Sequence, residues 1–170
     1  FINSGIIAEI PEKGSVGASG DLAPLSHLAL VLLGMGEAFY QGERLEGSKA
    51  MEKAGILPVK LAAKEGLALN NGTQVMTAVG AMALLRAEHL TRLADITAAA
   101  TIDALLATPN AFDKLIHELR PHEGQLKSSA NISKLLQNSP LRNSHIDCEN
   151  VQDAYSLRCT SQVHGAVRDS

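Results

Sequence analysis

The strongest restriction on the fold comes from a long proline-free stretch, residues 73–106, whose apolar side chains recur mostly at steps of three and four. These positions are Val75, Met76, Val79, Met82, Leu85, Leu90, Leu93, Ile96, Ile102 and Leu105. Such spacing gathers apolar side chains on one side of an α-helix, and the first helix breaker after it is Pro109. The stretch predicts one long helix, bent if anywhere near Gly80, within a mainly α fold.

Two shorter segments after this stretch repeat the helical pattern. The first has apolar residues at Phe112, Leu115, Ile116 and Leu119 and is stopped by Pro121. The second is amphipathic over residues 123–136 and ends before Asn138-Ser139-Pro140. Both segments predict helices that pack on a larger body.

The N-terminal part predicts a mixture of helix and hairpin. Asp21 stands where a helix cap would stand, because leucines at helical spacing follow it from Leu22 to Leu33. Residues 38–58 contain Tyr40-Gln41-Gly42-Glu43-Arg44, which indicates a short hairpin followed by a small helix around Ala50. This hairpin holds the only strands that we predict.

Composition excludes several classes of protein. Of the 170 residues, 45% are hydrophobic and 19% charged, which suits a globular domain with a buried core. The net charge of -3 leaves no basic excess for nucleic acid or an anionic membrane. No apolar run approaches the roughly 20 residues of a bilayer span, and no signal-peptide pattern opens the chain. We therefore expect a cytoplasmic protein without nucleic-acid or membrane partners.

The ends and the cysteines add two expectations. The chain opens with Phe1 rather than Met, and a helical pattern is still in progress at Arg168, so we expect a fragment of a longer protein. Cys148 and Cys159 are too few for a disulfide scaffold and suit a reducing compartment.

The glycine-rich segment Gly14-Ser15-Val16-Gly17-Ala18-Ser19-Gly20-Asp21 carries the clearest chemical signal. Its glycine spacing differs from the dinucleotide fingerprint, it lacks the Gly-Lys pair of a phosphate loop, and Asp21 replaces the second glycine of a nucleophile elbow. No strand is predicted before it. The segment alone leaves a plain turn before a helix open as the simplest interpretation.

A second interpretation is that the segment modifies itself. The amide nitrogen of Gly20 is unhindered, so a compressed turn can press it against the carbonyl carbon of Ala18 and close a five-membered ring with loss of water. Loss of the Ser19 hydroxyl together with its α-proton would then leave an exocyclic methylidene. Ala18, Ser19 and Gly20 would become a 4-methylidene-imidazol-5-one.

Three segments resemble the aromatic amino acid lyase family, which contains ammonia-lyases and related aminomutases. They are residues 14–27, Glu65-Gly66-Leu67-Ala68-Leu69-Asn70-Asn71-Gly72-Thr73-Gln74, and Val151-Gln152-Asp153-Ala154-Tyr155-Ser156-Leu157-Arg158-Cys159. Their order and separation agree with the family over nearly the whole chain. The resemblance implies a long-helix bundle of the fumarase/aspartase-like type, with the prosthetic-group loop at a helix N-terminus. It divides the chain into residues 1–72, the loop region, and 73–170, part of the central bundle.

The resemblance also implies functions for individual residues. Ala18, Ser19 and Gly20 would form the electrophilic methylidene-imidazolone, and Tyr155 would be a catalytic residue beside it. The substrate would be bound by Asn71 through hydrogen bonds, by Arg158 through a bidentate pair with the carboxylate, and by Gln152. On a helix, Gln152, Tyr155 and Arg158 would share one face. Without the resemblance, these residues would be a turn asparagine, a core tyrosine and surface polar groups.

The family pattern is not matched at every position. Asn70 stands where relatives usually have an aliphatic residue, and Ser161 replaces a usual proline. The resemblance further implies that the tyrosine base and other site residues of the family lie outside this chain. No metal and no dissociable cofactor is implied.

The substrate expectation also comes from resemblance. Residues 71–74 and 158–166 are more similar to the histidine-specific members of the family than to those acting on phenylalanine or tyrosine. We therefore expect non-oxidative conversion of L-histidine to trans-urocanate and ammonia in a homotetramer, with phenylalanine or tyrosine ammonia-lyase or aminomutase activity as the alternative.

A different class is suggested by His145, Cys148, Cys159 and His164, whose spacing superficially fits a zinc-binding interaction module. The first pair lies in a loop rich in Asn and Ser, and the second pair belongs to a segment that the family resemblance already explains. The remaining histidines, His27, His89, His117 and His122, are expected at the surface or as hydrogen-bonded core residues.

Overall fold

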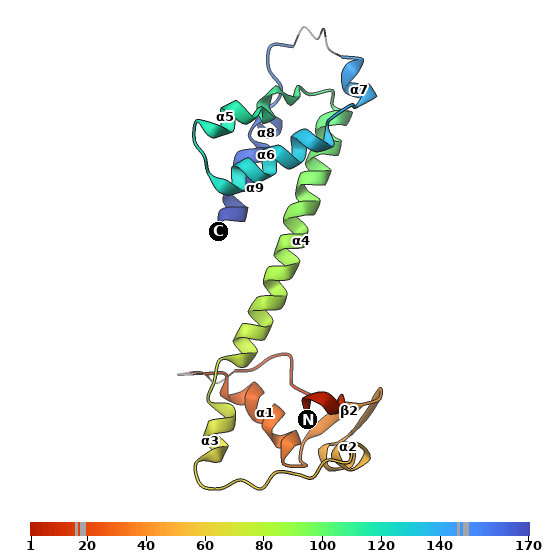
Figure 1. The fold of residues 1–170 in the computed structure, drawn as a ribbon, viewed down its shortest axis with the longest axis vertical. Helices are drawn as coiled ribbons and strands as arrows, with labels where there is room; N and C mark the ends of the chain where they lie inside the picture. The colour runs from red at the N-terminus through yellow and green to blue at the C-terminus, as the bar shows by residue number, and fades with distance from the viewer. Residues whose placement is uncertain (16, 18–19, 146, 148–149) are drawn as a thin grey trace. The chain divides into compact units, whose positions relative to one another are not determined.

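The computed structural model describes residues 1–15, 17, 20–145, 147 and 150–170. The chain forms two compact units, Phe1–Met82 and Ala83–Ser170, called here the N-terminal and C-terminal units. One helix, α4 (Gln74–Ala104), begins in the first and ends in the second (Figure 1). The predicted division between residues 72 and 73 stays a prediction.

The N-terminal unit contains a three-stranded antiparallel sheet in the order β1 (Ile7–Ala8), β2 (Glu37–Tyr40), β3 (Glu43–Glu46). Gln41 and Gly42 form the turn between β2 and β3 with φ of 51° and 84°, a combination typical of a type I′ hairpin. The hairpin and the following helix α2 (Gly47–Lys53) confirm the prediction for residues 38–58. The strand β1, preceded by a 3₁₀ turn η1 (Ile2–Ser4), was not predicted.

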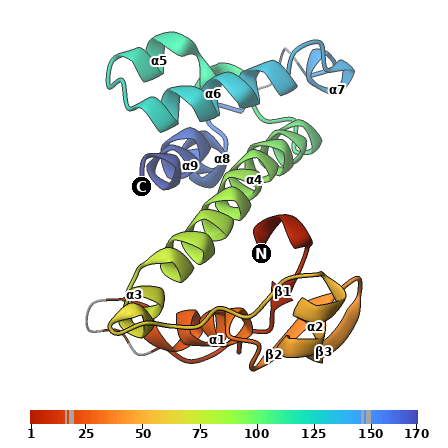
Figure 2. The ribbon, with the colours of Figure 1, turned by 60° about the horizontal axis from the view of Figure 1, so that its bottom comes forward.

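Packing in the N-terminal unit places α2 against β2 and β3, as Figure 2 shows. The core is formed by the buried side chains of Ile6, Val31, Ala38, Ala50 and Met51. Val31 comes from α1 (Leu22–Leu32), which also packs against α3 (Glu65–Asn70). The core thereby holds fixed the helix that begins just after the glycine-rich loop.

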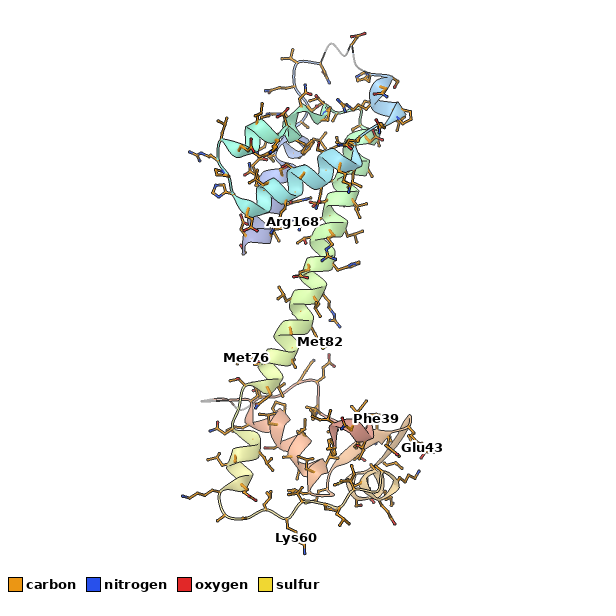
Figure 3. The ribbon with its side chains drawn as sticks, in the orientation of Figure 1. Phe39, Glu43, Lys60, Met76, Met82 and Arg168 are labelled. Atoms are coloured by element: carbon orange, nitrogen blue, oxygen red, sulfur yellow. The ribbon has the colours of Figure 1, made fainter. Side chains whose placement is uncertain are left out.

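The long helix is continuous from Gln74 to Ala104, so the prediction for residues 73–106 is confirmed and Gly80 does not interrupt it. Many of its large apolar side chains are exposed, including Met76 and Met82, which Figure 3 labels. Among the described residues, no helix has both the length and the apolar character needed to span a membrane.

The described residues that follow α4 in the C-terminal unit form a series of short helices. They are η2 (Pro109–Phe112), α5 (Lys114–Glu118), α6 (Glu123–Leu135), α7 (Pro140–Asn143) and α8 (Tyr155–Arg158), followed by the C-terminal helix α9 (Thr160–Asp169). The predicted helix over 112–119 is divided in two, because Asp113 leaves the helical conformation and its carboxylate accepts a bond of 2.8 Å from the Leu115 N–H. The predicted helix over 123–136 is confirmed as α6.

The crossing of α6 and α9 is very close at two glycines. A Cβ atom on Gly124 would collide with the carbonyl oxygen of Gly165, and one on Gly165 would collide with the backbone of Gln125. Beside this crossing lies the core of the unit, formed by Ala99, Ile102, Ala107, Phe112, Ile132 and Leu136. The fold is mainly α, as predicted; α4 and α6 contribute to this core, and α9 packs against α6.

Candidate functional site

The glycine-rich loop is described at Gly14, Ser15, Gly17 and Gly20, while the predicted Ala18 and Ser19 lie outside the described residues. At Gly20, a Cβ atom would lie 2.7 Å from the backbone oxygen and 2.8 Å from the backbone nitrogen of Gly72. At Gly17, a Cβ atom would lie 2.6 Å from the carbonyl oxygen of Gly20. Real Cβ atoms do not approach backbone this closely, so both positions require glycine.

Asp21 joins this loop to the start of α4. Its backbone N–H donates to the carbonyl of Gly72 over 2.8 Å, and its carboxylate Oδ2 accepts from the N–H of Met76 over 2.7 Å. Met76 is the third residue of α4, whose first N–H groups have no partner within the helix. Asp21 stands at the N-cap position of α1, as predicted, but its side chain does not cap α1 and serves α4 instead.

Asn71 lies next to Gly20, so the structure brings these two predicted site residues together. The predicted hydrogen bonds of Asn71 to the substrate stay a prediction. The side-chain Oδ1 of Asn71 would be 3.2 Å from a Cβ atom on Gly20. Asn71 follows the last residue of α3, Asn70, which holds that end of the helix against α1 by donating from Nδ2 to the Ser26 hydroxyl over 3.0 Å. The Asn71-Gly72 backbone and the Asn71 side chain therefore face the end of the loop that carries Gly20.

The residues available are compatible with the predicted prosthetic group. Ring closure needs an unhindered nitrogen at Gly20, and the structure leaves space for a glycine alone at that position. Backbone groups of Gly72 and the side-chain oxygen of Asn71 lie close to this position. The described surroundings of Gly20 thus fit the predicted group.

The second group of predicted residues belongs to the C-terminal unit. Tyr155 and Arg158 lie on one face of α8, with the Arg158 guanidinium carbon 5.4 Å from the centre of the Tyr155 ring. Arg158 donates from Nε to the carbonyl of Asp153 over 3.0 Å. Its two Nη nitrogens have no hydrogen-bond partner within the described part of the chain. One edge of the guanidinium is thereby fixed, and the other can bind a carboxylate in bidentate fashion.

The prediction that Gln152 extends this helical face is wrong. Residues 152–154 are not helical, and α8 begins at Tyr155. Gln152 instead lines a polar cavity of about 380 Å³ together with Thr108, Arg142, His145 and Asp153. The chain leaves the helical conformation here because the Asp153 carboxylate accepts from the N–H of Thr108 over 2.7 Å, a tertiary bond that a sequence pattern does not show.

Two residues of the zinc-like spacing, His164 and Cys159, have described surroundings. His164 donates from Nδ1 to the Asp95 carboxylate over 2.9 Å, and Cys159 is a free thiol at the start of α9. Cys148 lies outside the described residues. Across residues 1–15, 17, 20–145, 147 and 150–170, no group of three or more His, Cys, Asp or Glu side chains is arranged to hold a metal ion.

His117 behaves as a hydrogen-bonded core residue. It is fully buried, its Nε2 donates to the carbonyl of Ala111 over 3.1 Å, and its Nδ1 accepts from the Gln125 amide over 2.8 Å. Because a carbonyl oxygen can only accept, the proton lies on Nε2.

Sequence reasoning missed two residues, one in each unit, that hold predicted site residues or their loop in place. Asp21 was assigned to its own helix, although its bond to Met76 spans 55 positions of sequence. Asp153 was not singled out, although its carbonyl fixes the Arg158 side chain. Its place inside the segment 151–159 was the one available signal.

The model of the aromatic amino acid lyase family matches residues 1–170. The chain is 56% identical over all its 170 residues to a histidine ammonia-lyase of Koribacter versatilis, of which it covers 33%. The crystal structure of histidine ammonia-lyase from Trypanosoma cruzi aligns with a TM-score of 0.79 and 42% identity, over 96% of this chain and 29% of its own. Ergothionase from Treponema denticola, an ergothioneine-degrading enzyme, aligns with a TM-score of 0.92 and 31% identity, over 99% and 34%. The chain spans about a third of the length of these relatives.

Proposed function

Because this chain belongs to the aromatic amino acid lyase family, we propose that it is part of a histidine ammonia-lyase, which removes ammonia from L-histidine to give trans-urocanate. The observation that carries the proposal is the close packing of Gly20, the last residue of Ala18-Ser19-Gly20, against Asn71-Gly72. The choice of histidine rests on the 56% identity to a curated relative of that name. The same relatives support carbon-nitrogen lyase chemistry.

Ala18, Ser19 and Gly20 would form the 4-methylidene-imidazol-5-one, with no metal and no dissociable cofactor. This group would supply an electrophile for the substrate amine and so convert a poor leaving group into a good one. Gly20 contributes the unhindered nitrogen, and Asp21 keeps that end of the loop at the Gly72 carbonyl. Asn71 offers both a donor and an acceptor beside Gly20.

Arg158 would bind the substrate carboxylate through its two Nη groups, since Nε is already held by the Asp153 carbonyl. Lysine could not reproduce this planar, two-point geometry. The Tyr155 ring stacks beside the guanidinium and limits its rotation. Gln152 would contact the substrate from the polar cavity that it lines.

Self-association is part of the proposal. The full-length enzyme would be a cytoplasmic homotetramer, and the exposed apolar side chains of α4, Met76 and Met82 among them, would be covered in it. No nucleic-acid or membrane partner is proposed, in keeping with a net charge of -3.

The test uses the full-length enzyme. Intact mass and peptide mapping should show loss of the water released by ring closure and by serine dehydration, located at Ala18–Gly20, and an ultraviolet difference spectrum should report the conjugated ring. L-histidine should be converted to urocanate with a much higher kcat/KM than phenylalanine or tyrosine is converted to cinnamate or coumarate. An active enzyme with an unmodified loop would refute the prosthetic group. Faster turnover of phenylalanine or tyrosine would refute the substrate and leave the family chemistry in place.

A further inference from the structure

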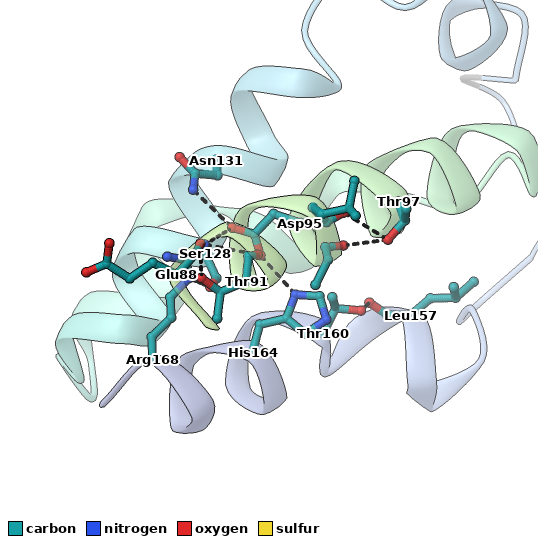
Figure 4. A network of polar contacts seen from close by, with 12 residues as sticks. Glu88, Thr91, Asp95, Thr97, Ser128, Asn131, Leu157, Thr160, His164 and Arg168 are labelled. Carbon is teal, nitrogen blue, oxygen red and sulfur yellow. Dashed lines mark hydrogen bonds and ion pairs between the residues drawn. The ribbon is translucent and has the colours of Figure 1, made fainter. Parts of the chain in front are cut away.

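One carboxylate of the C-terminal unit is buried among charged and polar donors. Asp95 of α4 is 1% exposed, and three side chains donate to it. The donors are Asn131 Nδ2 at 3.0 Å, His164 Nδ1 at 2.9 Å and Arg168 Nη2 at 2.7 Å (Figure 4). Asn131 belongs to α6, whereas His164 and Arg168 belong to α9. Asp95 therefore ties three helices together at one point.

Arg168 extends this network in a direction that fixes α9. Its Nε donates to the Ser128 hydroxyl over 2.9 Å, and its Nη2 also reaches the Thr91 carbonyl over 3.2 Å. With the bond to Asp95, the guanidinium is held by α4 and α6 from two sides (Figure 4). A planar group held at several points leaves the helix that carries it little freedom to slide or rotate.

The other end of α9 is coupled to α8. The Thr160 hydroxyl, in the first turn of α9, lies 3.0 Å from the carbonyl of Ser156 and 2.9 Å from that of Leu157 (Figure 4). Leu157 also packs against the core that contains Ala99 and Ile102 of α4. Arg158 and Tyr155 stand on the same four-residue helix as these carbonyls. A shift of α9 would therefore move the guanidinium that faces the substrate.

We propose that Asp95, His164 and Arg168 are positioning residues that fix α9 and, through α8, the Arg158–Tyr155 pair. Stability alone is a weak reason for such a cluster, because the desolvation of a buried ion pair offsets much of its attraction. What several hydrogen bonds to one buried carboxylate do provide is a single geometry. The inference rests on the proposed function of Arg158 as the ligand of the substrate carboxylate.

The test compares Asp95→Asn with the wild type in the full-length enzyme. The amide keeps the shape of the side chain but removes the charge that faces Arg168 and His164. We expect kcat/KM for histidine to fall by about ten- to a hundredfold, the size of effect that a displacement of about 1 Å produces at a reacting centre. The KM for histidine and the inhibition constant of urocanate, which also carries a carboxylate, should rise together.

A matched control separates positioning from loss of stability. Asp103→Asn makes the same carboxylate-to-amide change on the same helix, at a side chain whose described hydrogen bond comes from Ser139 and not from α8 or α9. It should lower the melting temperature while leaving the KM and the urocanate inhibition constant of the folded enzyme unchanged. If Asp95→Asn behaves in the same way, Asp95 is only structural and the inference is wrong.

If Asp95→Asn does not fold, a milder variant tests the same positioning role. His164→Ala removes one donor at a side chain that is 22% exposed and leaves the Asp95–Arg168 pair in place. A rise of a few-fold in both constants supports the inference, and unchanged constants overturn it. Arg158→Lys serves as the reference: if it does not alter carboxylate affinity, the proposed function of Arg158 fails, whatever the Asp95 variant does.

Discussion

Around Gly20 the chain brings backbone against backbone, whereas around Asp95, in the unit that carries Arg158, it brings polar and charged side chains together. The first region is limited by space, because a single carbon atom at Gly20 would lie 2.7 Å from the Gly72 oxygen. The second is limited by charge, because the Asp95 carboxylate is 1% exposed and needs the hydrogen bonds that His164 and Arg168 donate to it. An added side-chain atom at Gly20 should therefore lower activity, and so should the loss of the charge on Asp95.

The largest effect should come from adding one methyl group to the loop region. Gly20→Ala in the full-length enzyme should reduce kcat/KM by about a hundredfold or more, since the loop must move away from Asn71-Gly72 and the ring nitrogen becomes hindered. Urocanate formation and intact mass measure activity and modification separately. Gly80→Ala is the control, because a Cβ there meets nothing within 4 Å. Equal activity of both variants would show that space does not limit the loop.

In the helical region, Arg158→Lys keeps the charge and removes the two-point geometry together with the bond to the Asp153 carbonyl. We expect a loss of about 1.5–3 kcal/mol in transition-state binding, as for a hydrogen bond to a charged group. The KM and kcat for histidine measure how the loss is divided. Unchanged values of both would assign Arg158 to the surface.

Asp21 combines the two kinds of restriction, because it is a charged side chain in the loop region, where space is limiting. Asp21→Ala removes the acceptor for the Met76 N–H and should cost about 0.5–2 kcal/mol, the range for loss of a helix cap. Thermal unfolding of the full-length enzyme measures the loss. Asp21→Asn keeps an acceptor oxygen and should lose less. Equal losses in the two variants would mean that the charge matters more than the cap.

Ser161 should show the opposite sign. It is fully buried in the first turn of α9, and its hydroxyl has no partner among the described residues. Ser161→Pro should raise stability by about 0.4–1 kcal/mol, because proline restricts the unfolded chain and this turn needs no N–H donor. Ser161→Ala separates the loss of the hydroxyl from the effect of the ring. A lower melting temperature for the proline variant would contradict the expectation.

The smallest effect should come from an exposed ion pair of the hairpin. Lys53 lies 2.5 Å from Glu43, and its hydrogen bond and charge lower the pKa of that carboxyl. The pair therefore stabilises above the ordinary carboxylate pKa, and its contribution disappears as the pH falls through the lowered value. Lys53→Met should differ slightly from wild type in melting temperature at neutral pH and not at all in strong acid. A difference that grows with acidity would have the wrong sign.

Sequence alone predicted what depends on near neighbours. The periodicity of α4 and the Gln41-Gly42 turn are local, and both were found as expected. The strand β1 has two residues, too few to show alternation, and it exists because Ile7 and Ala8 pair with Phe39 and Ala38.

What could not be predicted depends on distant partners. Asp21 and Met76 are 55 positions apart, and Asp95 is 69 and 73 positions from His164 and Arg168. Gln152 was placed on the wrong element because periodicity cannot show that Asp153 bonds to Thr108. The site residues themselves were named through resemblance, which gives identities and no contacts.

The close crossing of α6 and α9 at Gly124 and Gly165 means that the effect of a substitution at one position depends on the residue at the other. A methyl group at Gly124 or Gly165 alone would push the helices apart, and α9 carries His164 and Arg168 with it. Once one substitution has separated the helices, the second meets more space. The double variant should therefore lose less free energy of unfolding than the two single variants lose in total. An alanine at either position would therefore be tolerated more readily in a homologue that has already lost the other glycine.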